Sequence, residues 1–105
     1  MKKLISMFLL LIATISSYQI QAAEDNKPFA EEKIVLQISD PNPFKQTQVL
    51  NVASNLIKYY WQDKVDVEIV AFGPGLRLLF EENVNSGRIK GLTSSGVTFS
   101  ACKNT

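Results

Sequence analysis

The sequence predicts an α/β protein built on a parallel β-sheet, and two observations lead to this prediction. Apolar, β-branched runs that read as strands occupy residues 33–39, 65–72 and 97–101. Segments with helical character separate them. Alternation of strands and helices implies a parallel sheet whose strands are joined by right-handed crossovers. We therefore expect three parallel strands with helices on both faces of the sheet.

The first strand and the helix after it are separated by a proline-rich turn. Residues 33–39 form a continuous apolar run, as expected for a strand that is covered on both faces. In the turn that follows, Asn42 can cap a helix that has Pro43 at its first position, a favoured place for proline. Apolar residues then recur at helical spacing until the helix ends near residues 61–63: Val49, Val52, Ala53, Leu56, Ile57 and Tyr60.

Glycines mark the predicted turns in the second half of the chain. Gly73-Pro74-Gly75 predicts a sharp turn into a short helix with an apolar face formed by Leu76, Leu79 and Phe80. Residues 86–95 predict another short helix, with Ile89 and Leu92 facing inward. Gly96 suits the C-terminal stop of that helix.

The exits of the three strands define the region where we expect a site. In a parallel sheet, the exits at Asp40, Gly73 and Cys102 share one edge, where open α/β sheets bind ligands. A flavodoxin-like order places the first strand between the second and the third. The crevice between the first and third exits would then have Asp40 and Cys102 on its two sides.

The N-terminus has the pattern of a secretory leader. Lys2 and Lys3 precede an apolar run at 4–15, and small residues allow cleavage after Ala22 or Ala23. The run is shorter than the roughly 20 residues of a spanning helix, so we expect no stable membrane anchor after cleavage. A buried N-terminal helix is the alternative interpretation.

This interpretation divides the chain into three parts. We expect a signal peptide at 1–23, a flexible linker at 24–32 and one small α/β domain at 33–105. The predicted location is the periplasm or the exterior of the cell. A domain of this size is marginally stable by itself, which favours self-association.

Composition excludes several classes of function. Lys and Arg number 11 against 10 Asp and Glu, and loss of the leader's lysines leaves a slightly acidic chain, which argues against nucleic-acid binding. The absence of histidine removes the commonest metal ligand and the usual general base. We therefore predict no metal and no cofactor. A lone cysteine cannot close a disulfide within the chain.

The residues at the strand exits each allow a chemical and a purely structural interpretation. Cys102 could act as a thiolate, helped by the neighbouring charge of Lys103, or it could be a small buried apolar residue. The backbone of residues 73–75 could bind an anion, or it could simply form a tight turn. Asp40 could act as an acid or base in the crevice, or it could stabilise an Asp-Pro turn.

Several segments together resemble the DsrE/DsrF-like family, and more narrowly its exported branch with the pattern hxxGPGL…GVxFxxCxNT. They are the strand ending in Asp40-Pro41, the run VDVEIVAFGPGL at 65–76 and the run GVTFSACKNT at 96–105. They cover nearly all of the chain after residue 32. The resemblance implies a flavodoxin-like domain that forms trimers or hexamers. It also implies a ligand-binding edge that includes the C-terminal pair Asn104 and Thr105.

The resemblance also implies a function for the cysteine. Some members of the family relay sulfur through a cysteine persulfide, and that cysteine matches Cys102. Those relays serve cytoplasmic sulfur oxidation or tRNA thiolation, whereas the leader directs this chain to an oxidising compartment. Family members continue past the Cys-x-Asn-Thr motif with a further helix and strand. We therefore expect a truncated or frame-disrupted copy, or an incomplete gene model, with an incomplete sheet.

Three interpretations of function follow from the sequence. The first is an exported sulfur carrier with persulfide or other thiol chemistry at Cys102, which would need a sulfur donor and acceptor. The second is a non-catalytic module that binds a small ligand or assembles into oligomers. The third is a non-functional fragment. Whether the chain is an enzyme stays open at this stage.

Overall fold

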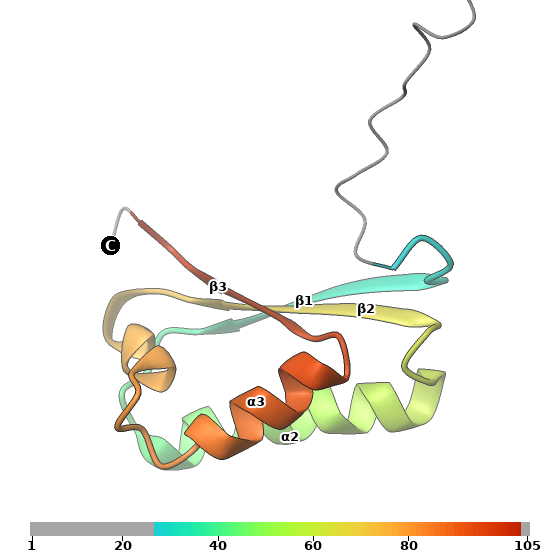
Figure 1. Cartoon of the computed structure of the whole chain (residues 1–105). Coiled ribbons are helices and arrows are strands. Elements are labelled where there is room, and N and C mark those ends of the chain that lie inside the picture. The colour runs from blue at the N-terminus through green and yellow to red at the C-terminus, as the bar shows by residue number, and fades with distance from the viewer. Residues whose placement is uncertain (1–26, 104–105) are drawn as a thin grey trace, which may run out of the picture.

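The computed structural model describes residues 27–103, which form a three-stranded parallel β-sheet with helices packed beneath it (Figure 1). The strands are β1 (Glu32–Ile38), β2 (Val65–Ala71) and β3 (Thr98–Ala101). The connections contain helix α2 (Pro43–Tyr60), the 3₁₀-helix η1 (Gly73–Leu79) and helix α3 (Ser86–Ser94). The α/β class and the parallel sheet that the sequence predicts are both confirmed.

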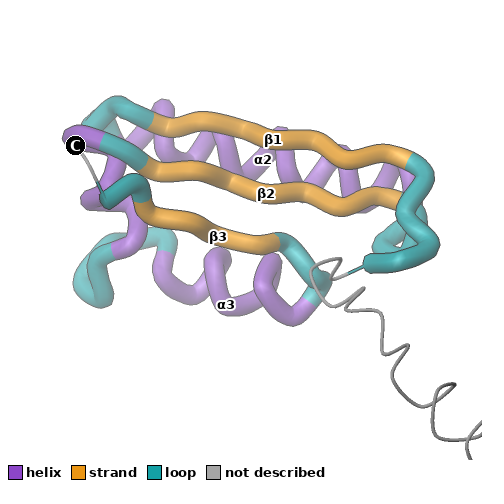
Figure 2. The backbone as a smooth tube through the Cα atoms, turned by 90° about the horizontal axis from the view of Figure 1, so that it is seen from above, coloured by secondary structure: helices purple, strands orange, loops and turns teal. Residues whose placement is uncertain are grey.

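The strand order differs from the flavodoxin-like order expected for these three strands. The sheet has the order β1-β2-β3, so β2 and not β1 is central (Figure 2). Register pairs run from Glu32 with Val65 to Ile38 with Ala71, and then from Glu68 with Thr98 onward. The expectation that β1 lies between the other two strands is therefore wrong for the described part of the chain.

The order of the strands also explains where the helices lie. Both crossovers step across the sheet in the same direction, and crossovers of one hand then place their helices on the same face. Figures 1 and 2 show α2 and α3 together beneath the sheet. The expected helices on both faces are thus found on one face only among residues 27–103.

The uncovered face gives each strand an alternating pattern. On β2 every second residue is fully buried against the helices, from Val65 to Ala71, while the residues between them are half-buried. On β1, Val35 points away from the helices and is 58% exposed. The apolar run of β1 led us to expect a strand that is covered on both faces. Among the described residues, β1 is covered on one face only, so this expectation is wrong.

Helix α2 begins as the sequence predicts but is rotated slightly from the predicted orientation. The Asn42 side chain caps the helix by accepting a hydrogen bond from the Phe44 N–H at 2.9 Å, and Pro43 stands at the first position. The fully buried residues of the helix are Gln46, Leu50 and Ala53. Val52, which the predicted apolar stripe includes, is exposed.

The core lies between the helices and the lower face of the sheet. Its buried residues are Ile38, Leu50, Ala53, Val65, Val67, Ile69, Ala71, Leu78 and Val97. In η1 the buried side chain is Leu78, whereas Phe80, expected on the apolar face of this segment, is exposed. Ile89 and Leu92 of α3 pack against the core as predicted, and Gly96 ends this region with a φ of 88°.

Part of the segment expected to be a flexible linker is fixed to the fold. The Lys27 ammonium donates hydrogen bonds to three backbone carbonyls, those of Gln62, Val65 (2.9 Å) and Ser95 (3.2 Å). The Glu31 N–H donates to the Lys64 carbonyl at 2.7 Å. Residues 27–31 thus join the start of β2 to the loop after α3. The expected leader at 1–23 lies outside the described residues.

Candidate functional site at the carboxyl edge

The three strand exits share one edge of the sheet, as the parallel arrangement predicts. The exits follow β1 at Asp40, β2 at Gly73 and β3 at Cys102 (Figure 1). Because β2 is central, its exit lies between the other two. Neighbouring strands lie about 4.8 Å apart, so Asp40 and Cys102 are separated by roughly two strand spacings. The expected crevice with these two residues on its sides is therefore not formed, since β2 fills the space between them.

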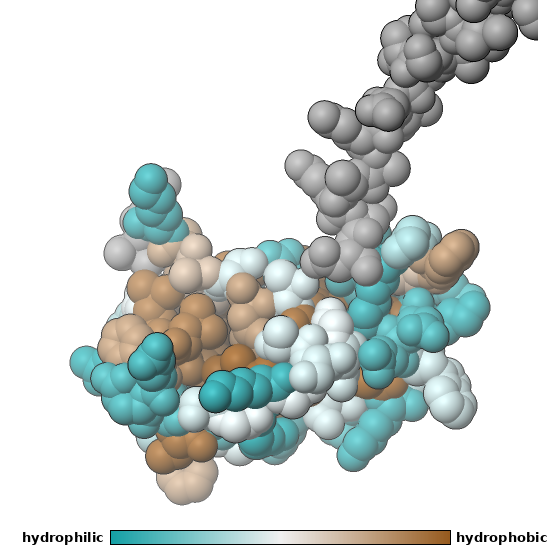
Figure 3. Space-filling view, viewed as in Figure 1, coloured by the Kyte–Doolittle hydropathy of each residue, from teal (hydrophilic) through white to brown (hydrophobic). Residues whose placement is uncertain are grey.

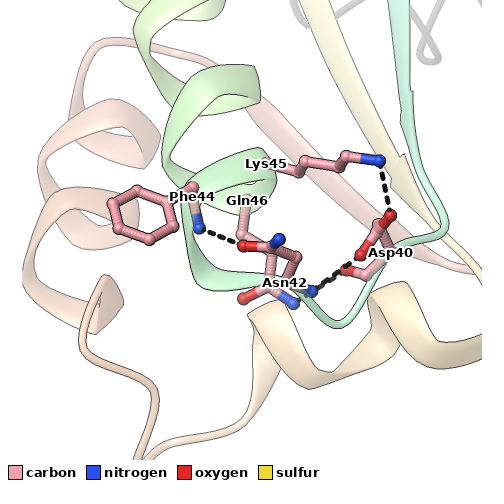
Figure 4. Close-up of polar contacts among 5 residues, drawn as sticks. All are labelled: Asp40, Asn42, Phe44, Lys45 and Gln46. Carbon is pink, nitrogen blue, oxygen red and sulfur yellow. Dashed lines mark hydrogen bonds and ion pairs between the residues drawn. The ribbon is translucent and has the colours of Figure 1, made fainter.

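Asp40 holds the turn between β1 and α2. Its carboxylate accepts a hydrogen bond from the Asn42 N–H at 2.8 Å and forms an ion pair with Lys45 at 3.0 Å (Figure 4). The hydrogen bond from Asn42, and then the hydrogen bond and charge of Lys45, lower the pKa of the Asp40 carboxyl. A carboxylate held ionised in this way is a weak base, so its contacts favour the structural role.

Gly73-Pro74-Gly75 forms the start of η1 and packs on the end of β1. The Phe72 N–H donates to the Ile38 carbonyl at 3.1 Å, which continues the ladder between β1 and β2 by one residue. The Gly75 N–H donates to the Phe72 carbonyl at 3.0 Å, and proline has no N–H. Of the three residues, only Gly73 therefore keeps a backbone N–H for an anion.

Cys102 directly follows the edge strand β3. Its N–H donates to the Ala71 carbonyl at 2.9 Å, so the β2–β3 ladder continues to this residue, and the cysteine is half-buried. Alternation along the strand places Cys102 on the same face as Ser100, the face without helices. The thiol is therefore at the sheet edge on its uncovered side. Asn104 and Thr105, also predicted at this edge, lie outside the described residues.

A polar pair on the uncovered face was missed by the sequence analysis. The Ser100 hydroxyl donates to the Glu68 carboxylate at 2.6 Å, across β2 and β3. The signal for it is the alternation of Asp66 and Glu68 with valine and isoleucine, which marks one face of β2 as polar. Strand order is also needed to see that Ser100 lies opposite.

A buried amide network supports the edge from below, and the sequence analysis missed it as well. Gln46 is 1% exposed; its amide donates to the Asp40 carbonyl at 3.1 Å and accepts from the Asn83 amide at 3.1 Å. Asn85, also buried, donates to the Thr47 hydroxyl at 3.2 Å. Every buried side-chain polar atom among the described residues has a partner. The network therefore fixes the loop between η1 and α3 to the start of α2, with no donor left for a ligand.

Two hollows in the described surface lie away from Cys102. One, of about 430 Å³, runs between α3 and β3 and is lined by Ile89, Thr93, Gly96, Val97, Thr98 and Phe99. Figure 3 shows hydrophobic surface gathered in the space between β3 and the helices below it. A second, of about 270 Å³, lies between β1 and α2. Neither hollow is lined by Asp40, residues 73–75 or Cys102.

The described part of the chain contains neither a metal-binding cluster nor a helix that could span a membrane. Among residues 27–103, no group of three or more His, Cys, Asp and Glu side chains could hold a metal ion. No helix within the same residues has the length and apolar character needed to span a bilayer.

Comparisons with known proteins bear on the fold alone. No protein-family model and no curated protein matches the chain. Among solved structures, the chain is similar to the protein of unknown function MTH1491 from Methanobacterium thermoautotrophicum, with a TM-score of 0.66 and 28% sequence identity. The similarity covers 70% of this chain and 65% of that chain, so this chain spans about two thirds of its neighbour. It supports the α/β architecture of parallel strands and helices.

Proposed function

We propose that this chain is an exported DsrE-like protein that carries sulfane sulfur on Cys102. The observation that supports the proposal is the position of this cysteine, which directly follows a strand of a parallel sheet, is half-buried and lies on the side without helices. The structural similarity to MTH1491 agrees with the fold that this family resemblance implies.

The proposed chemistry is a thiol exchange at the Cys102 sulfur. After losing its proton to solvent, the Sγ thiolate attacks the outer sulfur of thiosulfate or of a polysulfide. An S–S bond forms between Sγ and that sulfur, while the S–S bond of the donor breaks and sulfite or the shortened polysulfide leaves with the electron pair. An acceptor thiolate then attacks the outer sulfur of the persulfide and releases Cys102 as a thiolate.

The residues around Cys102 take supporting roles in this proposal. Lys103 is exposed beside the cysteine, and its positive charge favours the approach of an anionic sulfur donor. Asp40 and Gly75 shape the edge, because the first holds the β1 exit and the second packs against it. Neither residue is assigned a proton-transfer step.

Mass spectrometry of the intact protein tests the proposal. After exposure to thiosulfate or polysulfide, the chain should gain the mass of one sulfur atom, and reduction should remove it. Cys102→Ser should gain none, whereas Ser100→Ala, two residues away on the same face, should gain one as the parent does. An unmodified Cys102 in a sample that melts cooperatively would contradict the proposal.

Export is a separate part of the proposal and has its own test. The leader pattern at 1–23 supports cleavage after Ala22 or Ala23 and a periplasmic or secreted protein. N-terminal sequencing of the protein recovered from the cell envelope should begin at Ala23 or Glu24. An intact Met1 on cytoplasmic protein would contradict export without bearing on the sulfur chemistry.

A second candidate function, assembly into oligomers, is favoured by the groove between α3 and β3. This groove runs along an edge strand and is lined by Ile89, Val97 and Phe99, so a second copy that docked here would cover apolar surface. Light scattering should then report a trimer or hexamer that Phe99→Lys dissociates. A monomer at all concentrations would contradict this candidate.

A further inference from the structure

The outer edge of β1 is the longer of the two open edges of the sheet. β1 has seven residues and pairs with β2 on one side, and within residues 27–103 no strand lies on its other side (Figure 2). The opposite edge strand, β3, has only four residues. β1 contains no proline, and its register with β2 has no bulge, although both features commonly protect edge strands from pairing. β1 is therefore the edge better suited to pair with another strand.

The hydrogen bonds of the sheet fix which backbone groups of β1 point outward. The Phe72 N–H donates to the Ile38 carbonyl at 3.1 Å, so the backbone groups of Ile38 face β2. These groups alternate in direction along a strand, so those of Leu36 also face β2, whereas those of Val35 and Gln37 point to the outer edge. Val35 is the middle residue of the seven. The edge thus presents one donor and one acceptor at its centre, which is the arrangement that pairing with an identical strand requires.

A two-fold axis at Val35, perpendicular to the sheet, aligns β1 with the same strand of a second copy in antiparallel register. Val35 then lies opposite its own copy, and the two residues exchange both of their N–H···O=C hydrogen bonds. Gln37 lies opposite Lys33, and Glu32 lies opposite Ile38, so no two like charges on β1 are directly opposed. This register keeps all seven residues of β1 within the pairing.

The position of α2 fits the same two-fold arrangement. Helix α2 contacts β1 and β2 to the same extent and lies beneath the space between them (Figure 2). An axis perpendicular to the sheet keeps the helices of both copies on the same face. Because neighbouring strands are about 4.8 Å apart, α2 and its copy would lie roughly 10 Å from each other, the distance at which helices pack. Pairing of the two strands therefore also brings the two helices into contact.

Exposed valines mark both parts of this surface. Val35 is 58% exposed at the middle of β1, and Val52 is 40% exposed near the middle of α2. Val52 and Val49 line the hollow between α2 and the β1 edge, together with Gln37 and Lys45. The strand is about 23 Å long and the helix that returns beneath it about 27 Å, so their middles lie near the same level. One axis therefore covers Val35 and Val52 together, which packing within one copy leaves exposed.

We propose that a second copy of this chain pairs with the outer edge of β1 about a two-fold axis at Val35. The contact joins two three-stranded sheets into one continuous sheet, with α2 of each copy packed against the other beneath it. It is separate from the groove between α3 and β3, which lies along the other edge strand. It also does not depend on sulfur chemistry, so Cys102→Ser and Phe99→Lys should both leave the two-fold pair intact.

Disulfide trapping of the full chain in the Cys102→Ser background tests the register. Val35→Cys should form a covalent dimer on mild oxidation, because residues in a hydrogen-bonded antiparallel pair have Cα atoms about 5.5 Å apart, within the range of a disulfide. Gln37→Cys alone should not cross-link, because its copy lies four residues along the strand, more than about 10 Å away. A mixture of Gln37→Cys and Lys33→Cys proteins should cross-link to each other, since this register places the two residues opposite.

Sedimentation of the full chain measures the same contact without a covalent bond. In the Phe99→Lys background, where the groove between α3 and β3 does not contribute, the chain should be a dimer. Val35→Lys places two like charges opposite each other and should raise the dimer dissociation constant on the order of tenfold or more. Val84→Lys changes a valine that is 86% exposed in the loop between η1 and α3, and should leave the constant unchanged. Circular dichroism checks that both variants are folded.

Other results would overturn the proposal. A monomer in which the amides of Val35 and Gln37 exchange slowly with solvent would show that a segment of the same chain covers the edge. Rapid exchange of these amides at every protein concentration would show that the edge stays open. Equal association of Val35→Lys and Val84→Lys would place the contact elsewhere on the chain. Equal cross-linking of Val35→Cys and Gln37→Cys would indicate random collision and not a fixed register.

Discussion

Gly75 packs directly on the backbone of Ile38 and so joins the exits of two adjacent strands. A Cβ at Gly75 would overlap the Ile38 carbonyl oxygen and come within 2.5 Å of its carbonyl carbon and 2.8 Å of the Ser39 Cα. All of these are backbone atoms at the end of β1. The turn at residues 73–75 therefore needs glycine at its third position, because only glycine lets the turn pack this closely on the end of β1. This packing helps to shape the carboxyl edge of the sheet, where Cys102 also lies.

Gly75→Ala is expected to destabilise the fold by about 2 kcal/mol or more, because backbone atoms must move to admit the methyl group. Urea unfolding followed by circular dichroism measures the change. The matched control is Gly87→Ala in α3, where a Cβ meets nothing within 4 Å. This control should gain roughly 0.5–1 kcal/mol from helix propensity. Similar effects of the two substitutions would contradict the close packing at Gly75.

Asp40 should make the stability of the protein depend on acid pH. Its pKa in the folded chain is lowered from the ordinary value of 3.8, so its contribution is complete above that value and is lost as the pH falls through the folded pKa. Asp40→Asn keeps an acceptor for the Asn42 N–H but loses the ion pair with Lys45. The variant should be less stable than the parent at pH 7, and the difference should shrink below about pH 4.

Thermal unfolding at pH 7 and at pH 3 measures this difference for Asp40→Asn. Glu82→Gln, in the exposed turn before α3, serves as the control and should show the same small effect at both pH values. A stability gap between parent and Asp40→Asn that grows with acidity would have the wrong sign for a lowered pKa.

Lys27→Met should destabilise the fold by about 2 kcal/mol, because it removes a charged donor from three backbone carbonyls. The loss should be measured as a lower urea midpoint with an unchanged slope. Lys58→Met, which removes an exposed lysine from α2, should have little effect. Equal stability of the two variants would show that Lys27 does not hold residues 27–31 to the sheet.

Trp61→Gly should stabilise the fold by about 1 kcal/mol, because glycine relieves the unfavourable φ of 71° at this position at a small cost in chain entropy. Trp61→Ala retains a Cβ and should bring no such gain. Differential scanning calorimetry of both variants gives the comparison. A Trp61→Gly protein that melts below the parent would mean that the indole packs favourably and that the positive φ is not a net cost to the fold.

Features set by short sequence patterns could be predicted well. Asn42 and Pro43 start α2 because capping depends on adjacent residues, and Gly96 ends the α3 region because a positive φ is local to one residue. The strand spans followed from their apolar runs. The parallel sheet followed from alternation of elements, which correctly put Asp40, Gly73 and Cys102 at one edge.

Features set by contacts between distant segments could not be predicted in this way. Strand order depends on which strands pair, and no local pattern shows this. The predicted crevice between Asp40 and Cys102 is therefore wrong, although both residues were predicted at the correct edge of the sheet. Helix α2 carries apolar residues on more than one side, and its packing selects Leu50 over Val52. Gln46 is buried because Asp40 and Asn83 supply its partners, which no local pattern shows.

Both α-helices of residues 27–103 lie beneath the sheet, so no described helix covers the opposite face, on which Ser100 lies (Figure 1). Ser100 and Glu68 pair on that side, and the amide of Cys102 keeps the cysteine in register with the end of β2. A bulky partner that approaches this face meets no helix of residues 27–103. If Cys102 carries sulfur as we propose, this one-sided architecture lets a donor or an acceptor meet the sulfur by direct collision rather than through a gated tunnel.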